Sequence, residues 1–408
     1  MDAVATNPRL ERGLAIAKTL APRFRHVAGD IFFVPSQTGR GGYLVDASRG
    51  QCSCPDAEAN GAGHVCKHRF ALRYHRHEIP MPDGSTMVSQ ALHISYPQGP
   101  RWTAAQCAEL DYAQRLSRNL CNGIVSPRQF GRGKRRIVLG DAVHCLVMKT
   151  YRGLSGRRSM SDLRASKSLG FIQCLPAYNT LYTVMGSPFL TPLFRRLIDE
   201  TARPLAAIET GFAADATGFS TLTYAPTSWF EHKHHGDQKV KDWVKLHAMC
   251  GVQTNVITSA IVSPRGDSTQ FEALLDGTVA NDFDVQEAYV DKGYLKHTHL
   301  ATVHDIGGKL FVPFKSNSSG ETGDALWDSL FHLYSYNREA FQSHYGKRQN
   351  VEATFSGIKR KFGPAVRSRS PVAQRNEVYV KVLCWNISML VHSIFELGIE
   401  AEFWKGRR

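Results

Sequence analysis

The second half of the chain alternates short apolar runs with helical segments, and this order restricts the folds that it can adopt. The apolar runs are bounded by Gly, Pro or Asn, which is typical of β-strands. The predicted strands are residues 206–214, 244–251, 254–262, 287–290 and 309–314. Helices are predicted over 268–275 and 295–303, and a third begins near Asp324. Strands joined through a helix tend to be parallel and tight hairpins are antiparallel, so the order predicts a mixed sheet covered by helices.

That layout is an α/β domain of the ribonuclease-H-like class, which we assign to residues 204–400, and it would gather three acids. Asp215 ends the first predicted strand and Asp291 ends the fourth. If these strands are neighbours, their carboxylates meet at the carboxyl edge of the sheet, and Glu352 approaches from the final helix. Each acid also has a simpler explanation, as a turn residue, a helix N-cap and a surface acid respectively. Their joint placement favours a shared site.

The chemistry of such a site is set by its charges. Clustered carboxylates repel unless divalent cations are bound, and their oxygens select Mg²⁺ or Mn²⁺, which promote phosphodiester displacement. On one α-helix, Tyr345, Arg348 and Lys359 would fall on the same side as Glu352. A surface helix with salt bridges explains these four residues alone, whereas phosphate-binding groups around one carboxylate indicate a metal beside a nucleic-acid backbone. A helix that starts at Gly346 would place the Tyr345 phenol by loop geometry.

An excess of positive charge indicates a polyanionic partner. The 408 residues include 50 Lys and Arg against 36 Asp and Glu, which gives a net charge of +14. Nucleic acid fits this charge better than a membrane, because no apolar run approaches the ~20 residues that span a bilayer. The N-terminus lacks the basic-then-apolar pattern of a signal peptide, so we expect a cytoplasmic protein. The run 128–136 places five cations beside glycines, which favours backbone-phosphate contact over a solvated loop.

The first half of the chain divides into a short N-terminal module, 1–77, and a helical region. Residues 78–101 are rich in turn residues and are interpreted as a linker, and the apolar spacing over 102–203 is helical. Segments 159–170 and 177–185 have the proportions of a helix-turn-helix, a pattern that pairs of core helices share. We interpret this region as helices for DNA binding or oligomerisation.

Four potential zinc ligands lie in one short window near the N-terminus, as Cys52-Ser-Cys54 and Cys66-Lys-His68. Zn²⁺ takes four such ligands, and a Cys-x-Cys pair on an extended segment presents both sulfur atoms from one face. The pattern resembles a SWIM zinc finger over about residues 30–77. Such modules bind DNA or protein, and both possibilities stay open. A disulfide is the alternative, which a reducing cytosol disfavours and which leaves His68 unexplained.

Other histidines and cysteines are not expected to bind metal. His64, His75 and His77 exceed the four donors of one tetrahedral ion, and the histidines of 232–235 lie in a polar stretch typical of solvated side chains. Five cysteines stand singly, and we expect them to be buried reduced thiols. They are Cys107, Cys121, Cys145, Cys174 and Cys384. The last predicted helix, 372–397, carries an apolar array that core packing explains.

Three motifs in the second half belong together. Asp215 stands in Asp-x-Thr-Gly, Asp291 in Asp-Lys-Gly-Tyr, and Glu352 follows a phenol and a guanidinium and precedes an ammonium at fixed spacing. Together these motifs resemble a bacterial insertion-sequence DDE transposase of the Tyr-Arg-Glu-Lys signature group, with similarity over about residues 241–386. The resemblance implies that the three acids bind the catalytic metals. The residues that it implies for phosphate binding are Tyr345, Arg348, Lys359, Lys292 and Lys315.

The resemblance also implies cut-and-paste transposition, in which the ends of a double-stranded DNA element are cleaved and the freed 3′-hydroxyls are joined to target DNA. Proteins of this kind act in paired-end complexes, so a homodimer or larger assembly on DNA is implied. The short interval from Asp291 to Glu352 lacks room for the long β insertion of some relatives, which leaves the cleavage route open. The SWIM-like finger is an unusual companion. A catalytically inactive, transposase-derived DNA-binding regulator and a metal-dependent nuclease without strand transfer are the alternatives.

Overall fold

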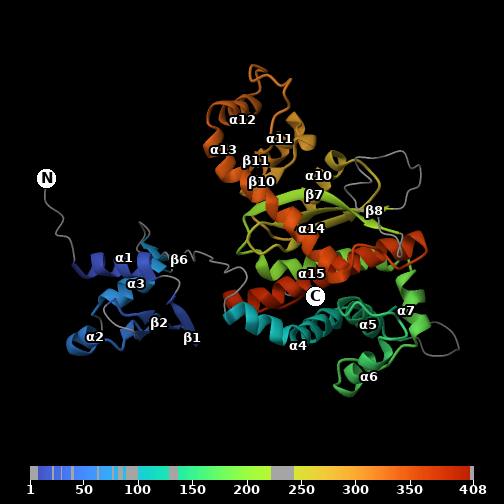
Figure 1. The fold of residues 1–408 in the computed structure, drawn as a ribbon, viewed down its shortest axis with the longest axis horizontal. Helices are drawn as coiled ribbons and strands as arrows, with labels where there is room; N and C mark the ends of the chain where they lie inside the picture. The colour runs from blue at the N-terminus through green and yellow to red at the C-terminus, as the bar shows by residue number, and fades with distance from the viewer. Residues whose placement is uncertain are drawn as a thin grey trace. The chain divides into compact units, whose positions relative to one another are not determined.

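The computed structural model divides the chain into two compact units, Met1–His93 and Ile94–Arg408 (Figure 1). The residues that it describes are 8–20, 23–28, 30–37, 41–61, 64–75, 78–80, 86–88, 100–127, 137–221 and 243–404. Two segments interpreted from the sequence, the basic run 128–136 and the histidines of 232–235, lie outside these ranges.

The N-terminal unit is a small antiparallel sheet packed against helices. The sheet has the order β1-β2-β3-β4, and its strands are Arg25–Ala28, Ile31–Pro35, Gly42–Asp46 and Gln51–Cys52. The helices are α1 (Pro8–Leu20), α2 (Pro55–Asn60) and α3 (Lys67–His75). Helices α1 and α3 pack together. The core of this unit is formed by Ile16, Phe24, Val34, Val45, Ala71 and Leu72.

Part of the predicted linker is structured. Strands β5 (Glu78–Pro80) and β6 (Thr86–Val88) pair in an antiparallel ladder. Helix α4 (Pro100–Asn122) then begins the described part of the second unit, two residues before the predicted helical region.

The second unit opens with helices, as the apolar spacing over 102–203 predicts. After α4 they are α5 (Leu139–Tyr151), α6 (Met160–Ser168), α7 (Tyr178–Met185) and α8 (Leu190–Ala202). Helices α6 and α7 coincide with the two segments of helix-turn-helix proportions. The boundary that we placed at residue 203 falls inside this unit, because α15 (Pro371–Leu397) packs against α4, α5 and α8 as well as against the sheet.

A five-stranded mixed sheet forms the other part of the unit, with the order β11-β10-β7-β8-β9. The strands are β7 (Gly211–Ser220), β8 (Trp243–Gly251), β9 (Ile257–Val262), β10 (Glu287–Val290) and β11 (Lys309–Phe311). The first three are antiparallel neighbours, whereas β10 is parallel to both β7 and β11. The predicted mixed sheet is confirmed, with a short connection between the antiparallel strands β8 and β9 and a helix between the parallel strands β10 and β11.

The first strand differs from its predicted position. A 3₁₀ helix, η2 (Arg203–Leu205), and a turn precede it, and β7 starts at Gly211 rather than at residue 206. Asp215 therefore lies inside the strand and not at its end. The reason is pairing: β8 is hydrogen-bonded along β7 as far as Ser220, which keeps the backbone extended beyond the acid despite its low strand propensity.

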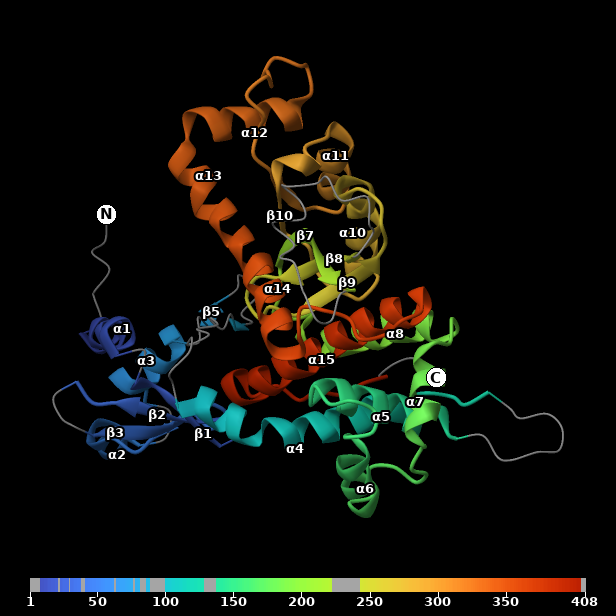
Figure 2. The same cartoon turned by 45° about the vertical axis from the view of Figure 1, so that its right-hand side comes forward.

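Helices cover the sheet and supply the segment that reaches the acids. They are α10 (Phe271–Val279), α11 (His297–Asp305), α12 (Ala325–Tyr336), α13 (Arg338–Tyr345) and α14 (Gln349–Phe362). Figures 1 and 2 show α14 crossing the sheet, and α15 lying between the sheet and helices α4 and α5. Within the fully described range 243–404, the interval from Asp291 to Glu352 carries no strand except β11, as its length predicts.

Helix α15 is long and apolar enough, by composition, to cross a membrane. Its most apolar 18-residue window is, however, 83 % buried inside the protein. This burial identifies it as the core helix that the sequence predicts over 372–397.

Candidate active site and candidate metal centre

Two of the predicted acids lie at the same level of adjacent parallel strands. Ala214 of β7 pairs with Val290 of β10, and each is followed directly by an acid, Asp215 and Asp291. Asp291 is also the N-cap of a 3₁₀ helix, η4 (Lys292–Tyr294), where its Oδ1 accepts a hydrogen bond of 2.7 Å from the first backbone N–H. The N-cap explanation of Asp291 is therefore correct, and it is compatible with a position beside Asp215.

Arg348 joins Asp215 to Glu352. The chain passes from α13 through a 3₁₀ helix, η5 (Gly346–Arg348), into α14, which begins at Gln349. Arg348 Nη2 donates to Asp215 Oδ2 at 2.9 Å, and Nη1 donates to Glu352 Oε1 at 2.7 Å. The Arg348 side chain is 16 % exposed, whereas Glu352 is 58 % exposed. Glu352 is thus linked to β7 through a guanidinium.

The electrostatics of Asp215 show a shortage of positive charge. Burial raises the pKa of its carboxyl, and the Arg348 guanidinium opposes that shift. The carboxylates of Asp267 and Asp291 raise the pKa further. Asp267 is paired with Lys245, so the Arg348 guanidinium is the cation shared by Asp215 and Glu352, a charge balance that a divalent cation would improve.

The donor chemistry fits Mg²⁺ or Mn²⁺, but in this arrangement the three acids do not enclose one point. Within the described residues, the group of three or more side chains placed to hold a single ion is the Cys and His group of the N-terminal unit. Arg348 lies instead between Asp215 and Glu352. One carboxylate oxygen of Asp215 and one of Glu352 are hydrogen-bonded to this guanidinium.

The residues from Tyr345 to Lys359 do not share one α-helix, so this prediction is wrong at its start. Tyr345 ends α13, and η5 intervenes with about three residues per turn instead of 3.6, which changes the direction of the phenol relative to Glu352. The Tyr345 backbone is nevertheless helical, with φ of −62° and ψ of −29°, so a loop does not place it. Burial raises the pKa of Tyr345 to about 12, and the phenol is a hydrogen-bond donor at neutral pH.

Lys359 lies apart from the acids. It follows Glu352 by two helical turns, a rise of about 10 Å, and its Nζ is 5.8 Å from the centroid of the Phe219 ring on β7. Burial lowers the pKa of Lys359 to about 8. No carboxylate pairs with Lys359 in the described part of the chain. Its ammonium group is therefore available to an anion lying along α14.

Other predicted cations differ in availability. Lys292 and Lys315 are exposed, the first directly after Asp291 and the second after β11. The basic end of α14 is less available than the sequence indicates. Lys361 forms an ion pair with Glu109 and donates to Ser388 at 2.6 Å, so it is held by α4 and α15.

Two residues near the acids carry weak sequence signals. Asp267 begins a 3₁₀ helix, η3 (Asp267–Gln270), and its Oδ1 lies 2.6 Å from Lys245 Nζ and 3.3 Å from His247 Nδ1. Asp267 follows the edge strand β9, and no sequence motif marks it. Tyr294 closes the Asp-Lys-Gly-Tyr motif and is buried. Its hydroxyl has no hydrogen-bond partner among the described residues.

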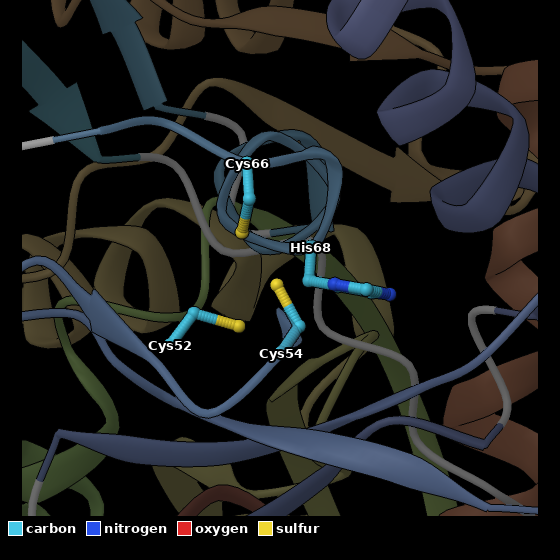
Figure 3. A group of neighbouring side chains, drawn as sticks. All are labelled: Cys52, Cys54, Cys66 and His68. Carbon is cyan, nitrogen blue, oxygen red and sulfur yellow. The ribbon is translucent and has the colours of Figure 1, made fainter. Parts of the chain in front are cut away.

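The predicted zinc ligands converge in the N-terminal unit. Cys52 ends β4, Cys54 is the N-cap of α2, and Cys66 and His68 flank the first residue of α3. Their ligand atoms all lie within 4.8 Å of one another, and Figure 3 shows the three sulfur atoms pointing toward a common centre beside His68. This spacing suits a tetrahedral ion held by three sulfurs and one nitrogen.

The surroundings of these ligands also fit a metal. His68 is 2 % exposed, and neither of its ring nitrogens has a hydrogen-bond partner among the described residues. Contact with Cys52 lowers the pKa of Cys66 to about 3, which favours a thiolate. His64 pairs with Asp56 instead, at 3.4 Å. His75 stacks on Phe24, and His77 lies outside the described residues.

All nine cysteines are free thiols, which agrees with the choice of metal ligands over a disulfide. Of the five single cysteines, Cys121, Cys145 and Cys384 are buried as expected. The prediction is wrong for Cys107 and Cys174, which are exposed. Cys107 lies on the outer face of α4, and Cys174 lies in the connection between α6 and α7, so neither contributes to the core.

Comparison with known families gives one result for the sheet region. Residues 207–387 match the family model described as the transposase DDE domain. No curated protein matches the chain. The matched range starts just before β7 and ends within α15, so it contains the three candidate acids. The match and the strand order agree, and residues 207–387 therefore support the identification of a DDE transposase domain with a ribonuclease-H-like fold.

Proposed function

We propose that the chain is a DNA transposase that cleaves the ends of a mobile element and joins the freed 3′-hydroxyls to target DNA. The observation that carries this proposal is the placement of Asp215 and Asp291 at the same level of adjacent strands, with Glu352 linked to Asp215 through Arg348. These three acids would hold Mg²⁺ or Mn²⁺. When bound, such ions supply charge neutralisation at the phosphodiester and activate the attacking oxygen.

The remaining residues would bind and orient the DNA backbone. The Tyr345 phenol can donate to a phosphate oxygen, and burial, which raises its pKa to about 12, keeps it a donor at alkaline pH as well. Lys359 is charged below pH 8 and lies further along α14, where a neighbouring phosphate would pass. Lys292 and Lys315, both exposed, would contact the same strand from the ends of β10 and β11.

The helices before the sheet offer a second set of DNA contacts. Basic residues around α6 are exposed, and α7 packs against α5 and α15. The exposed cations are Arg157, Arg158, Arg164 and Lys167. A net charge of +14 supports a polyanionic partner for this surface. We include in the proposal a homodimer or larger assembly on DNA, in the bacterial cytoplasm.

The N-terminal unit would hold Zn²⁺ through Cys52, Cys54, Cys66 and His68. This ion would have a structural role, because the four donors leave no open position for a substrate. The unit would then serve as a SWIM-type module that binds either the element's DNA or a partner protein.

The acids can be tested by cleavage of a labelled fragment that carries an element end. Glu352→Gln and Asp291→Asn should each lower cleavage in Mg²⁺ about a thousandfold, because a lost metal ligand removes several kcal/mol of transition-state stabilisation. Glu339→Gln, an exposed acid on α13, is the matched control and should cleave like the unmodified protein.

Unchanged cleavage in Glu352→Gln would overturn the metal-site assignment. Binding of the fragment with no cleavage in Mg²⁺ or Mn²⁺ would favour the inactive regulator. A strand-transfer assay into a plasmid separates the remaining alternative, since a nuclease would cut the fragment without joining it.

A further inference from the structure

Arg348 is the one guanidinium that the described residues place between two candidate metal ligands. It reaches Asp215 Oδ2 at 2.9 Å and Glu352 Oε1 at 2.7 Å with two different nitrogens. Its side chain is only 16 % exposed, and its Nε is buried without a hydrogen-bond partner among the described residues. The guanidinium therefore donates to the two acids through Nη1 and Nη2, while its Nε keeps an unused donor.

A divalent cation at these acids would draw on the same two carboxylates that Arg348 now contacts through one oxygen each. Carboxylate oxygens that accept charge-assisted hydrogen bonds from a guanidinium lose that interaction when they turn to a metal ion. The two positive groups would also repel if both stayed beside Asp215. Arg348 and the divalent ion are thus competitors for Asp215 and Glu352.

The same guanidinium matches a backbone phosphate. Its planar fork binds two oxygens of one phosphate as well as it binds two carboxylates, and the unpartnered Nε adds a further donor. Glu352 can be released from Arg348 at little cost. It is 58 % exposed and lies in the first turn of α14, where the helix dipole favours its negative charge.

We propose that Arg348 acts as an internal cation that keeps the site from taking up a divalent metal until a DNA backbone phosphate draws the guanidinium away. DNA and metal then bind with positive cooperativity, and the bare protein has a low metal affinity. This inference rests on the proposed function for the assignment of the three acids. It adds a positioning role to Arg348, in which the residue links substrate binding to assembly of the metal site.

The alternative is that Arg348 merely ties α14 to β7. In that case its removal would loosen Glu352 and leave the metal affinity unchanged or lower. Under our proposal its removal raises the metal affinity, because the competitor is gone. The two explanations therefore predict opposite signs.

Mn²⁺ binding to the full-length protein, measured by electron paramagnetic resonance without DNA, tests this sign. Arg348→Gln should bind Mn²⁺ about tenfold more tightly than the unmodified protein, within the usual range of coupling between sites. Lys347→Gln is the matched control, since Lys347 pairs with Glu287 at 3.0 Å and not with the three acids. It should bind Mn²⁺ like the unmodified protein.

The reciprocal measurement uses fluorescence anisotropy of a mixed-sequence DNA duplex. Mn²⁺ should tighten duplex binding by the unmodified protein more than by Arg348→Gln, because coupling is reciprocal and the variant has lost it. Equal gains in both proteins would contradict the coupling.

A Mn²⁺ affinity of Arg348→Gln equal to or weaker than that of the unmodified protein would overturn the proposal. Should this variant fail to fold by circular dichroism, Arg348→Lys replaces it. A single ammonium cannot bridge both acids, so Arg348→Lys should show an intermediate gain in Mn²⁺ affinity. The absence of any gain would also overturn the proposal. Failure of the proposed function would give a different result. The unmodified protein would cleave no DNA, but Arg348→Gln would still bind Mn²⁺ more tightly, and adding Asp215→Asn to that variant would abolish the gain.

Discussion

The two candidate metal sites of this chain differ in how the charge of their ligands is balanced. In the N-terminal unit, three thiols and an imidazole lie within 4.8 Å of one another. In the second unit, Asp215 and Glu352 are separated by the guanidinium of Arg348. The first site would take its cation from outside, whereas the second contains the guanidinium of Arg348. A site with an internal cation keeps its fold without metal and can be regulated by what displaces that cation.

The two units also differ in what stabilises them. The N-terminal core is a small cluster around Ile16, Val34 and Val45. The core of the second unit runs continuously from α4 through the sheet to α15. Small cores supply little stability, and modules of this size often depend on a metal or a disulfide. The N-terminal unit is thus expected to need its ion to fold, and the second unit is not.

Removal of zinc should therefore have the largest effect. Cys54→Ser, or a chelator added to the full chain, should unfold the N-terminal unit, because metal binding contributes about 10 kcal/mol or more to such modules. Hydrogen exchange should show lost protection over residues 8–75 and retained protection over 243–404, with zinc content measured by mass spectrometry.

Cys107→Ser provides the control for this comparison, because that thiol is exposed and lies outside the ligand set. It should keep both zinc and protection. A folded N-terminal unit without bound zinc would show that its apolar core is sufficient, and the contrast between the units would disappear.

A smaller effect is expected where the second unit meets DNA. Lys359 has a pKa of about 8, so raising the pH from 7 to 9 converts its ammonium to a neutral amine in the free protein. Phosphate binding must then restore the proton, and affinity should fall above pH 8, by at most about tenfold for each pH unit. Lys381 also has a pKa of about 8 and lies over the same Phe219 ring, but it donates to the carbonyls of Gly363 and Ala365.

Lys359→Arg isolates the contribution of Lys359, since a guanidinium stays charged over this range. Duplex binding by the variant, followed by anisotropy at constant ionic strength, should lose most of the pH dependence. The same steep fall in both proteins would assign the titration to another group, such as Lys381, and would remove Lys359 from the DNA-binding surface.

The order of strands and helices around these sites can be predicted from the sequence better than the side-chain contacts within them. The sequence of strands and helices follows from local apolar runs, but the pairing of the strands beside Asp215 and Asp291 is only a condition of the predicted site, and the structure supplies it. Local patterns do not reveal that β8 extends β7 past Asp215, because pairing between distant segments decides this. The break at η5 and the bridge by Arg348 depend equally on tertiary contacts, and Asp267 reaches the site from a turn without a motif.

The candidate zinc ligands show the opposite case. That their side chains lie close together could be predicted from the sequence, because four donors of this kind stand within a short window. The exposure of Cys107 and Cys174 could not be predicted, since an isolated cysteine carries no information about which face of a helix or loop it occupies.

The smallest predicted effect concerns unpartnered polar atoms, which occur at both sites. In the N-terminal unit they are the ring nitrogens of His68, and in the second unit the hydroxyl of Tyr294 is the clearest case. Burial of a hydroxyl without a partner costs about 1 to 3 kcal/mol. Tyr294→Phe keeps the ring packed against Phe271 and should raise the free energy of unfolding of the second unit by about 1 kcal/mol.

Tyr379→Phe is the matched comparison, because this tyrosine is equally buried but its hydroxyl accepts a hydrogen bond of 2.9 Å from the Val262 N–H. Its loss should lower the free energy of unfolding by about 1 kcal/mol, so denaturant titrations of the two variants should shift in opposite directions. A destabilised Tyr294→Phe would mean that the hydroxyl is satisfied in solution. A stabilised variant would mean that the Tyr294 hydroxyl has no partner in the folded protein. Like Arg348 Nε, it would then be a donor available to a ligand at the acid site.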